Sequence, residues 1–134
     1  MTTPDHSTGE VKAVIQRLIE SVADNNTAIL DELYHDDMQV IMLSPGDEVS
    51  VSGKAEFRDM IRSALEANGG TIGTWARFHH VSVDGDRAHV LLSRQNELTG
   101  PDMQITLGID LAREQDRWQI TREVIVTRPR TTAA

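Results

Sequence analysis

Apolar residues in the first part of the chain recur every third or fourth position. Between residues 8 and 23 this spacing places one apolar stripe along an α-helix, formed by Val11, Val14, Ile15, Leu18, Ile19 and Val22. Ser7 and Glu10 have capping-box spacing, so we expect the helix to begin near Ser7, after a tail over residues 1–7. Asp24-Asn25-Asn26 should end it, because Asn tolerates the left-handed conformation of a helix C-terminus.

Two more helices and a first pair of strands are predicted before residue 71. Asn26 can cap a short helix whose apolar face is Ile29, Leu30, Leu33 and Tyr34. The run 38–43 predicts a strand, 44–47 a turn, and Val49 with Val51 a brief second strand. Gly53 precedes a third helix with the apolar stripe Phe57, Met60, Ile61, Ala64 and Leu65.

From Thr71 onward the hydrophobic period changes from helical spacing to two. We expect strands over about 72–83, 87–99, 103–113 and 117–128. Short polar links such as Asp84-Gly85 favour hairpins, so the four strands should form an antiparallel meander. Three helices followed by such a sheet predict one α+β domain over 8–128, with a curved, mainly antiparallel sheet around the helices and a tail over 129–134.

The predicted sheet has apolar residues on both faces. Val90 and Leu92 share one face of their strand, whereas Leu91 lies on the other. Three helices can cover only one face, so we expect the other to contact a second copy of the chain in a homodimer.

Composition narrows the function classes. Thirteen Lys and Arg residues against 21 Asp and Glu residues give a formal net charge of −8. An acidic surface repels nucleic acid and anionic membranes, so neither is expected as a partner. The absence of cysteine excludes disulfides and thiolate chemistry. Residues 1–10 lack the pattern of a signal peptide, and we expect a cytoplasmic protein.

Several short segments resemble the SnoaL-like family of the nuclear-transport-factor-2-like superfamily. They are Asn25-Asn26, residues 33–37 (LYHDD), Gly53-Lys54, residues 83–88 (VDGDRA) and Trp118-Gln119-Ile120. The resemblance covers about residues 8–127. It implies a cone-shaped α+β barrel with a pocket at its open end, often dimeric through the sheet, but it names no activity, because one fold hosts unrelated functions.

The catalytic residues of two enzymes of that superfamily can be compared with positions in this chain. Ketosteroid isomerase needs a tyrosine near Leu18 and a carboxylate base near Met42, so we expect no isomerase activity. Limonene epoxide hydrolase uses an Asp-Arg-Asp trio, which Arg94-Gln95-Asn96 and Arg122-Glu123 resemble in part. Asn96 stands in place of one aspartate and cannot act as an acid.

Arg94 is the first candidate for a functional residue. It shares a strand face with apolar residues, and a buried guanidinium requires a carboxylate, for which Asp110 and Glu123 are candidates. We expect Arg94 and Asp110 in one polar network facing the interior of the cone, with Asn96 positioning water or substrate. A purely structural ion pair is the alternative.

The remaining candidates would line a ligand pocket: Leu18, Met42, Trp75, His80, Trp118 and Arg122. In a strand His79 and His80 would point to opposite faces, with His80 on the side of Phe78. His35-Asp36-Asp37 is interpreted as a solvated turn, so no metal ligand is assigned, and no phosphate loop indicates a cofactor.

The sequence thus predicts a protein that holds a small apolar molecule in its cone. Simple binding and cofactor-free acid/base or water-activating chemistry both remain open. An epoxide hydrolase-like or polyketide cyclase-like enzyme and a non-catalytic oligomerisation module are the alternatives.

Overall fold

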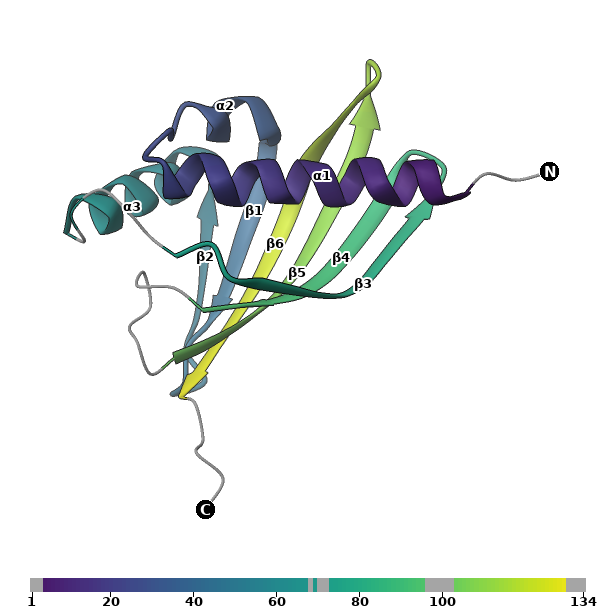
Figure 1. The fold of residues 1–134 in the computed structure, drawn as a ribbon. Helices are drawn as coiled ribbons and strands as arrows, with labels where there is room; N and C mark the ends of the chain where they lie inside the picture. Colours follow the sequence, from purple (N-terminus) through teal and green to yellow (C-terminus); the bar gives the residue numbers. More distant parts are fainter. Residues whose placement is uncertain (1–3, 68, 70–72, 96–102, 130–134) are drawn as a thin grey trace.

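The computed structural model describes residues 4–67, 69, 73–95 and 103–129. Three helices pack on one side of a six-stranded, curved sheet (Figure 1). The helices are α1 (Pro4–Ala23), α2 (Ile29–Leu33) and α3 (Lys54–Ala67). The strands are β1 (Tyr34–Leu43), β2 (Val49–Gly53), β3 (Ala76–Asp84), β4 (Arg87–Arg94), β5 (Met103–Glu114) and β6 (Arg117–Pro129). The predicted α+β architecture is confirmed.

The sheet order is β2-β1-β6-β5-β4-β3. The last four strands form the predicted antiparallel meander, and β1 antiparallel to β2 forms the first pair. The two groups join where β1 runs parallel to β6. This junction brings residues 34–43, early in the chain, beside residues 120–126 near its end.

The long helix α1 crosses the concave side of the sheet, with α2 and α3 at one end of it (Figure 1). Its predicted apolar stripe is buried from Val11 to Val22, apart from Val14, which is partly buried. Burial of such a stripe supplies most of the stability of a helix in a globular protein. Among the described residues, no helix is long and apolar enough to cross a membrane.

Two boundaries near the N-terminus differ from the sequence-based expectation. The first helix begins at Pro4, so Ser7 lies inside it and does not cap it. Proline is favoured in the first helical turn, because its missing N–H has no partner there in any case. The predicted end is confirmed: Asn25 has a φ of 64°.

The second helix has only five residues, and Tyr34 belongs to the following strand. The strand thus starts four residues before the predicted Met38. Tyr34 is 2% exposed and lies against the ring of Phe57 from α3.

Two β-bulges interrupt the alternation of the meander. The β3–β4 register shifts between Phe78 and His80, and the β5–β6 register shifts between Asp110 and Leu111, which leaves Thr121 unpaired. A bulge opposes two residues to one, so side-chain parity reverses beyond it. A prediction of the sheet face on which a side chain lies is therefore wrong where it assumed strict alternation across one of these positions.

Candidate functional site

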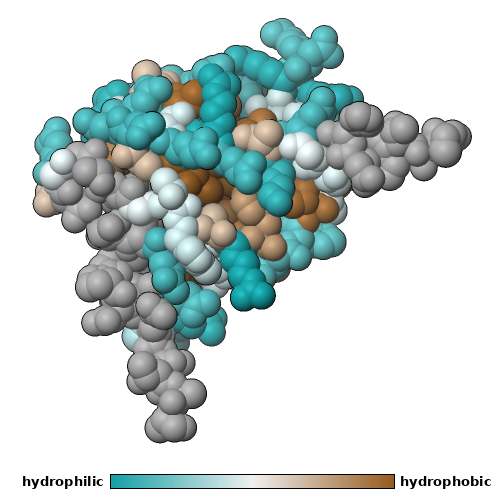
Figure 2. Space-filling model, in the orientation of Figure 1, coloured by the Kyte–Doolittle hydropathy of each residue, from teal (hydrophilic) through white to brown (hydrophobic). Residues whose placement is uncertain are grey.

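A cavity of about 230 Å³ lies between α1, α3 and the concave face of the sheet. All but three of its lining residues are apolar: Ile15, Leu18, Ile19, Val22, Met42, Phe57, Met60, Ile61, Ala64, Leu92, Ile105, Leu107, Ile109 and Ile125. Apolar surface is visible below the hydrophilic outer side of α1 (Figure 2). Cavities with apolar walls of about 150 Å³ hold a benzene-sized molecule, so this one has room for a larger compound.

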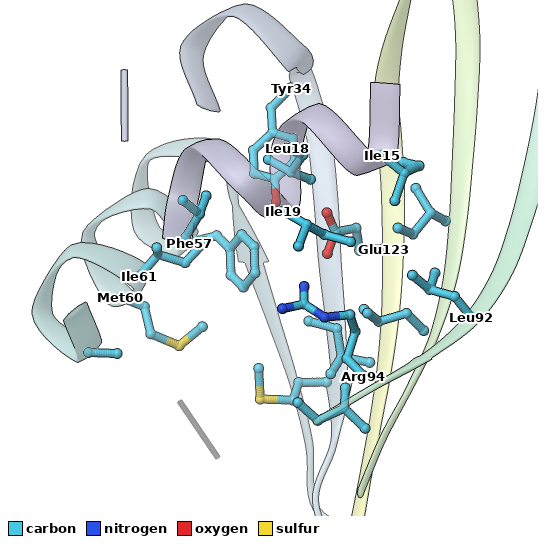
Figure 3. A pocket seen from close by; sticks show the side chains of 17 residues that line it. Ile15, Leu18, Ile19, Tyr34, Phe57, Met60, Ile61, Leu92, Arg94 and Glu123 are labelled. Carbon is cyan, nitrogen blue, oxygen red and sulfur yellow. The ribbon is translucent and has the colours of Figure 1, made fainter. Parts of the chain in front are cut away.

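The three polar lining residues converge from three strands. Tyr34 begins β1, Arg94 ends β4, and Glu123 lies in the middle of β6 (Figure 3). All three are almost completely buried, with 2%, 7% and 4% exposed, respectively. Buried polar groups need partners to offset lost hydration, so their contacts define what the site can do.

The Tyr34 hydroxyl donates a hydrogen bond to the Glu123 carboxyl. Burial raises the pKa of Glu123 from 4.5 to about 7, opposed by this hydrogen bond and by the positive charge of Arg94. Burial, followed by the Glu123 charge, raises the pKa of Tyr34 well above its usual 10.0. Glu123 thus exchanges its proton near neutral pH, whereas Tyr34 remains a donor.

One carboxyl oxygen of Glu123 is not satisfied. Oε2 is buried and has no hydrogen-bond partner among the described residues. An unpaired buried oxygen costs about 1–3 kcal/mol, and it lies in a residue that lines the cavity. Glu123 therefore carries a desolvation cost that the described residues do not offset.

Arg94 connects the cavity to the segment before β3. Its Nε donates to the Trp75 carbonyl and its Nη2 to the Gly73 carbonyl, both at 2.9 Å. A guanidinium can make such a fork because its donors are fixed in one plane. Arg94 consequently holds residues 73–75 and places a positive charge beside Glu123.

The predicted network between Arg94 and Asp110 is wrong. Asp110 is hydrogen-bonded to His89 at 2.7 Å, and its side chain is 43% exposed. Its neighbours Ile109 and Leu111 are buried, so Asp110 points to the convex face of the sheet. Glu123, the other carboxylate considered for Arg94, faces the cavity instead.

The other sequence candidates divide between the cavity and the rest of the molecule. Leu18 and Met42 belong to the lining, as does Arg94. Asn96 lies outside the described residues. The cavity lining includes none of the remaining four: Trp75, His80, Trp118 and Arg122.

The bulges explain two of these misplacements. His80 pairs with Leu91 and is exposed, as is His79, because the bulge after Phe78 breaks the expected alternation. Arg122 pairs with Asp110 and is exposed, because the bulge at Thr121 reverses its parity relative to Ile120.

The two tryptophans are positioned by other contacts. Trp75 is 47% exposed, and its backbone carbonyl is what Arg94 binds. Trp118 is buried, but it packs away from the cavity with the guanidinium of Arg113 over its ring.

Sequence reasoning missed Tyr34 as a site residue because it appeared to continue a helix. Glu123 was considered only as an ion-pair partner. Its signal is a carboxylate directly before the β-branched run Val124-Ile125-Val126, in a strand where a buried charge needs a partner. Among the described residues, no group of three or more His, Asp or Glu side chains could hold a metal ion.

The pattern of the SnoaL-like domain matches residues 15–123. Because this match spans most of the chain, the chain belongs to the SnoaL-like family. None of the curated proteins compared with the chain matches it.

Solved structures agree on the fold. An NTF2-like protein of unknown function from Silicibacter pomeroyi superposes with a TM-score of 0.75 at 19% identity, covering 96% of this chain and 100% of that one. An NTF2-like protein of unknown function from Shewanella baltica gives 0.74 at 12% identity, with 96% and 99% covered. One from Methylobacillus flagellatus gives 0.70 at 14% identity, with 96% and 95% covered. At such identities the similarity establishes the nuclear-transport-factor-2-like fold, with its cone shape, and not an activity.

Proposed function

We propose that this protein binds a small, mainly apolar molecule in the cavity between α1, α3 and the sheet. The observation that carries the proposal is the cavity of about 230 Å³, whose lining is apolar apart from Tyr34, Arg94 and Glu123. A concave apolar site with a few convergent polar groups is typical of small-molecule pockets. The open cavity disfavours the alternative of a pure oligomerisation module with a filled cone.

Native mass spectrometry of the protein purified from its own host tests this proposal. We expect a retained small molecule in the wild type. Ala64→Phe, which fills part of the cavity from α3, should abolish retention. Ala55→Phe is the matched control, because Ala55 is exposed on the same helix and outside the lining. Absence of any retained molecule, or equal retention in both variants, would contradict the proposal.

Cofactor-free acid/base chemistry is a second candidate, favoured by the Glu123 carboxyl that titrates at about pH 7 inside the cavity. A general acid or base works best when its pKa lies near the operating pH. Arg94 and Glu123 would then be the reacting or orienting groups, in an epoxide hydrolase-like or polyketide cyclase-like reaction. Turnover of an epoxide or polyketide substrate by the wild type and by Glu123→Gln alike would exclude this role for Glu123.

The second proposed partner is another copy of the chain on the convex face. Apolar side chains from four strands line that face in register: Leu91 on β4, Val124 on β6, Ile41 on β1 and Val51 on β2. Val51 is 58% exposed, Leu91 37% and Val124 36%. A contiguous exposed apolar patch favours association, which supports a homodimer through the sheet.

A further inference from the structure

An open groove of about 440 Å³ lies between α1 and residues 74–78, where the chain enters β3. Apolar side chains that are at least partly buried and polar side chains that are exposed both line this α1–β3 groove. The apolar ones are Ile19, Ala76 and Phe78, and the polar ones are Lys12, Gln16, Glu20, Thr74 and Arg77.

The groove follows the free edge of the sheet. The strand β3 is last in the sheet order, and among the described residues it pairs with β4 alone. Adjacent residues of a strand point to opposite faces, so a groove lined by both Arg77 and Phe78 reaches them around this edge. The edge offers backbone N–H and C=O groups to a further strand, and an extended peptide can bind in this way.

Opposite charges lie at the two ends of the groove. The Lys12 ammonium is 5.0 Å from the centroid of the Phe78 ring, and Arg77 precedes Phe78 in β3. Because β3 runs toward the N-terminal end of α1 (Figure 1), Glu20 lies at the other end, near Thr74. Within the described ranges, none of Lys12, Glu20 and Arg77 forms an ion pair.

The spacing of these charges sets the length and direction of a ligand. Lys12 and Glu20 are separated by about 12 Å along α1, at about 1.5 Å per residue. An extended peptide advances about 3.3 Å per residue, so about four residues span this distance. With its ammonium at Glu20 and its carboxylate at Lys12 and Arg77, such a peptide runs parallel to β3.

We propose that the α1–β3 groove binds a short peptide with free termini, about four residues long, as an additional strand beside β3. Glu20 binds its ammonium, Lys12 and Arg77 bind its carboxylate, and the edge of β3 pairs with its backbone. The site is separate from the cavity, although Ile19 contributes to both linings. The inference therefore goes beyond the proposed function and does not rest on it.

Four forms of the peptide Ala-Val-Ala-Val test the role of the charges: both termini free, the amine acetylated, the carboxylate amidated, and both blocked. Affinities are measured by NMR titration of the wild-type protein, in which the backbone amides of residues 74–78 should shift. Each blocked terminus should weaken binding about threefold to fivefold, as expected for an ion pair in contact with solvent. Equal affinity of the four forms, or binding of none, overturns the inference.

Substitutions assign each terminus to its partner. In Glu20→Gln the free amine and its acetylated form should bind equally, and in the double variant Lys12→Met, Arg77→Met the acid and its amide should bind equally. Glu10→Gln is the matched control, because Glu10 is exposed on α1 outside the groove, and it should keep both differences. Differences that survive in the groove variants contradict the assigned contacts.

N-Methylation of the peptide tests the pairing with the edge of β3. Only every second residue of an added strand directs its N–H toward the neighbouring strand. Methylation of one of the two central amides should therefore weaken binding about fivefold to tenfold, and methylation of the other should have little effect. Equal effects at both positions would show that the peptide does not add a strand.

Ala64→Phe separates this site from the cavity, whose lining includes Ala64. The variant should bind the peptide with unchanged affinity, and loss of peptide binding would place the peptide in the cavity and overturn the inference. A wild-type protein that binds the peptide but retains no small molecule contradicts only the proposed function. A protein that retains a small molecule but binds no peptide contradicts only this inference.

Discussion

The hydroxyl of Tyr34 and the carboxyl of Glu123 form a hydrogen bond inside the cavity, although 89 positions separate them in the chain. The parallel pairing of β1 with β6 brings them together. Each residue changes the proton affinity of the other: the tyrosine holds the pKa of Glu123 down, and the carboxylate raises the pKa of Tyr34. The stability of the protein should therefore depend on the protonation of this pair.

Glu123→Gln should remove a stability loss that the wild type shows with rising pH. Between pH 4.5 and about pH 7 the folded protein keeps a proton on Glu123 that the unfolded chain has released. Stability falls with pH wherever the folded state binds more protons. The loss should be about 3 kcal/mol across this window, since one pKa unit corresponds to about 1.4 kcal/mol.

Urea unfolding of the wild type and Glu123→Gln at a series of pH values measures this effect. The difference between the two curves cancels the contribution of the five histidines. We expect the variant to gain stability relative to the wild type from pH 4.5 upward, with a plateau above about pH 7. A difference that does not change with pH would show that Glu123 has an ordinary pKa.

Tyr34→Phe should destabilise the protein more at pH 8 than at pH 5. The hydroxyl donates more strongly to the ionised carboxylate, and hydrogen bonds to charged groups contribute about 1.5–3 kcal/mol. Its removal should also raise the pKa of Glu123 further, because this hydrogen bond lowers it. The same substitution in the Glu123→Gln background is the control, and there its cost should be independent of pH.

The broad architecture could be predicted because its signals are local. The stripe of α1 and the alternating residues of the meander give the element types, and their order gives the α+β class. The parallel pairing of β1 with β6 joins segments distant in sequence, and no local pattern encodes it.

The site was harder to predict because it depends on which face of the sheet each side chain occupies. A bulge reverses this alternation. Counting through Thr121 put Arg122 on the face of Ile120, whereas the structure puts Glu123 in the cavity. Asp110 was assigned to the interior as a partner for Arg94, but His89 on the neighbouring strand binds it on the convex face. The partner of a charged residue is set by tertiary contacts that parity alone does not determine.

Val124→Glu should convert a dimer into a monomer. Val124 lies near the centre of the row formed with Leu91, Ile41 and Val51, so a charge there would be desolvated in the interface. Sedimentation velocity at micromolar concentration is the measurement. Ala55→Glu adds the same charge on the exposed side of α3 and should remain a dimer. A monomeric wild type would disprove the proposed interface.

Arg94→Met should raise the pKa of Glu123 above its present value of about 7, because the guanidinium charge favours the ionised carboxylate. NMR titration of the Glu123 carboxyl carbon, assigned by its loss in Glu123→Gln, measures this pKa directly. Arg94→Lys is the matched control. It loses the planar fork to the carbonyls of residues 73 and 75 but keeps the positive charge.

The two Arg94 variants distinguish the effect of the positive charge from the effect of the hydrogen bonds to the backbone carbonyls. Both should lose stability, because the two backbone carbonyls lose hydrogen bonds of about 1 kcal/mol each. Only Arg94→Met should raise the pKa of Glu123. In Arg94→Lys the lysine ammonium should hold this pKa near its wild-type value. An unchanged midpoint in Arg94→Met would mean that the guanidinium charge does not reach Glu123, and that Arg94 serves only to anchor the segment before β3.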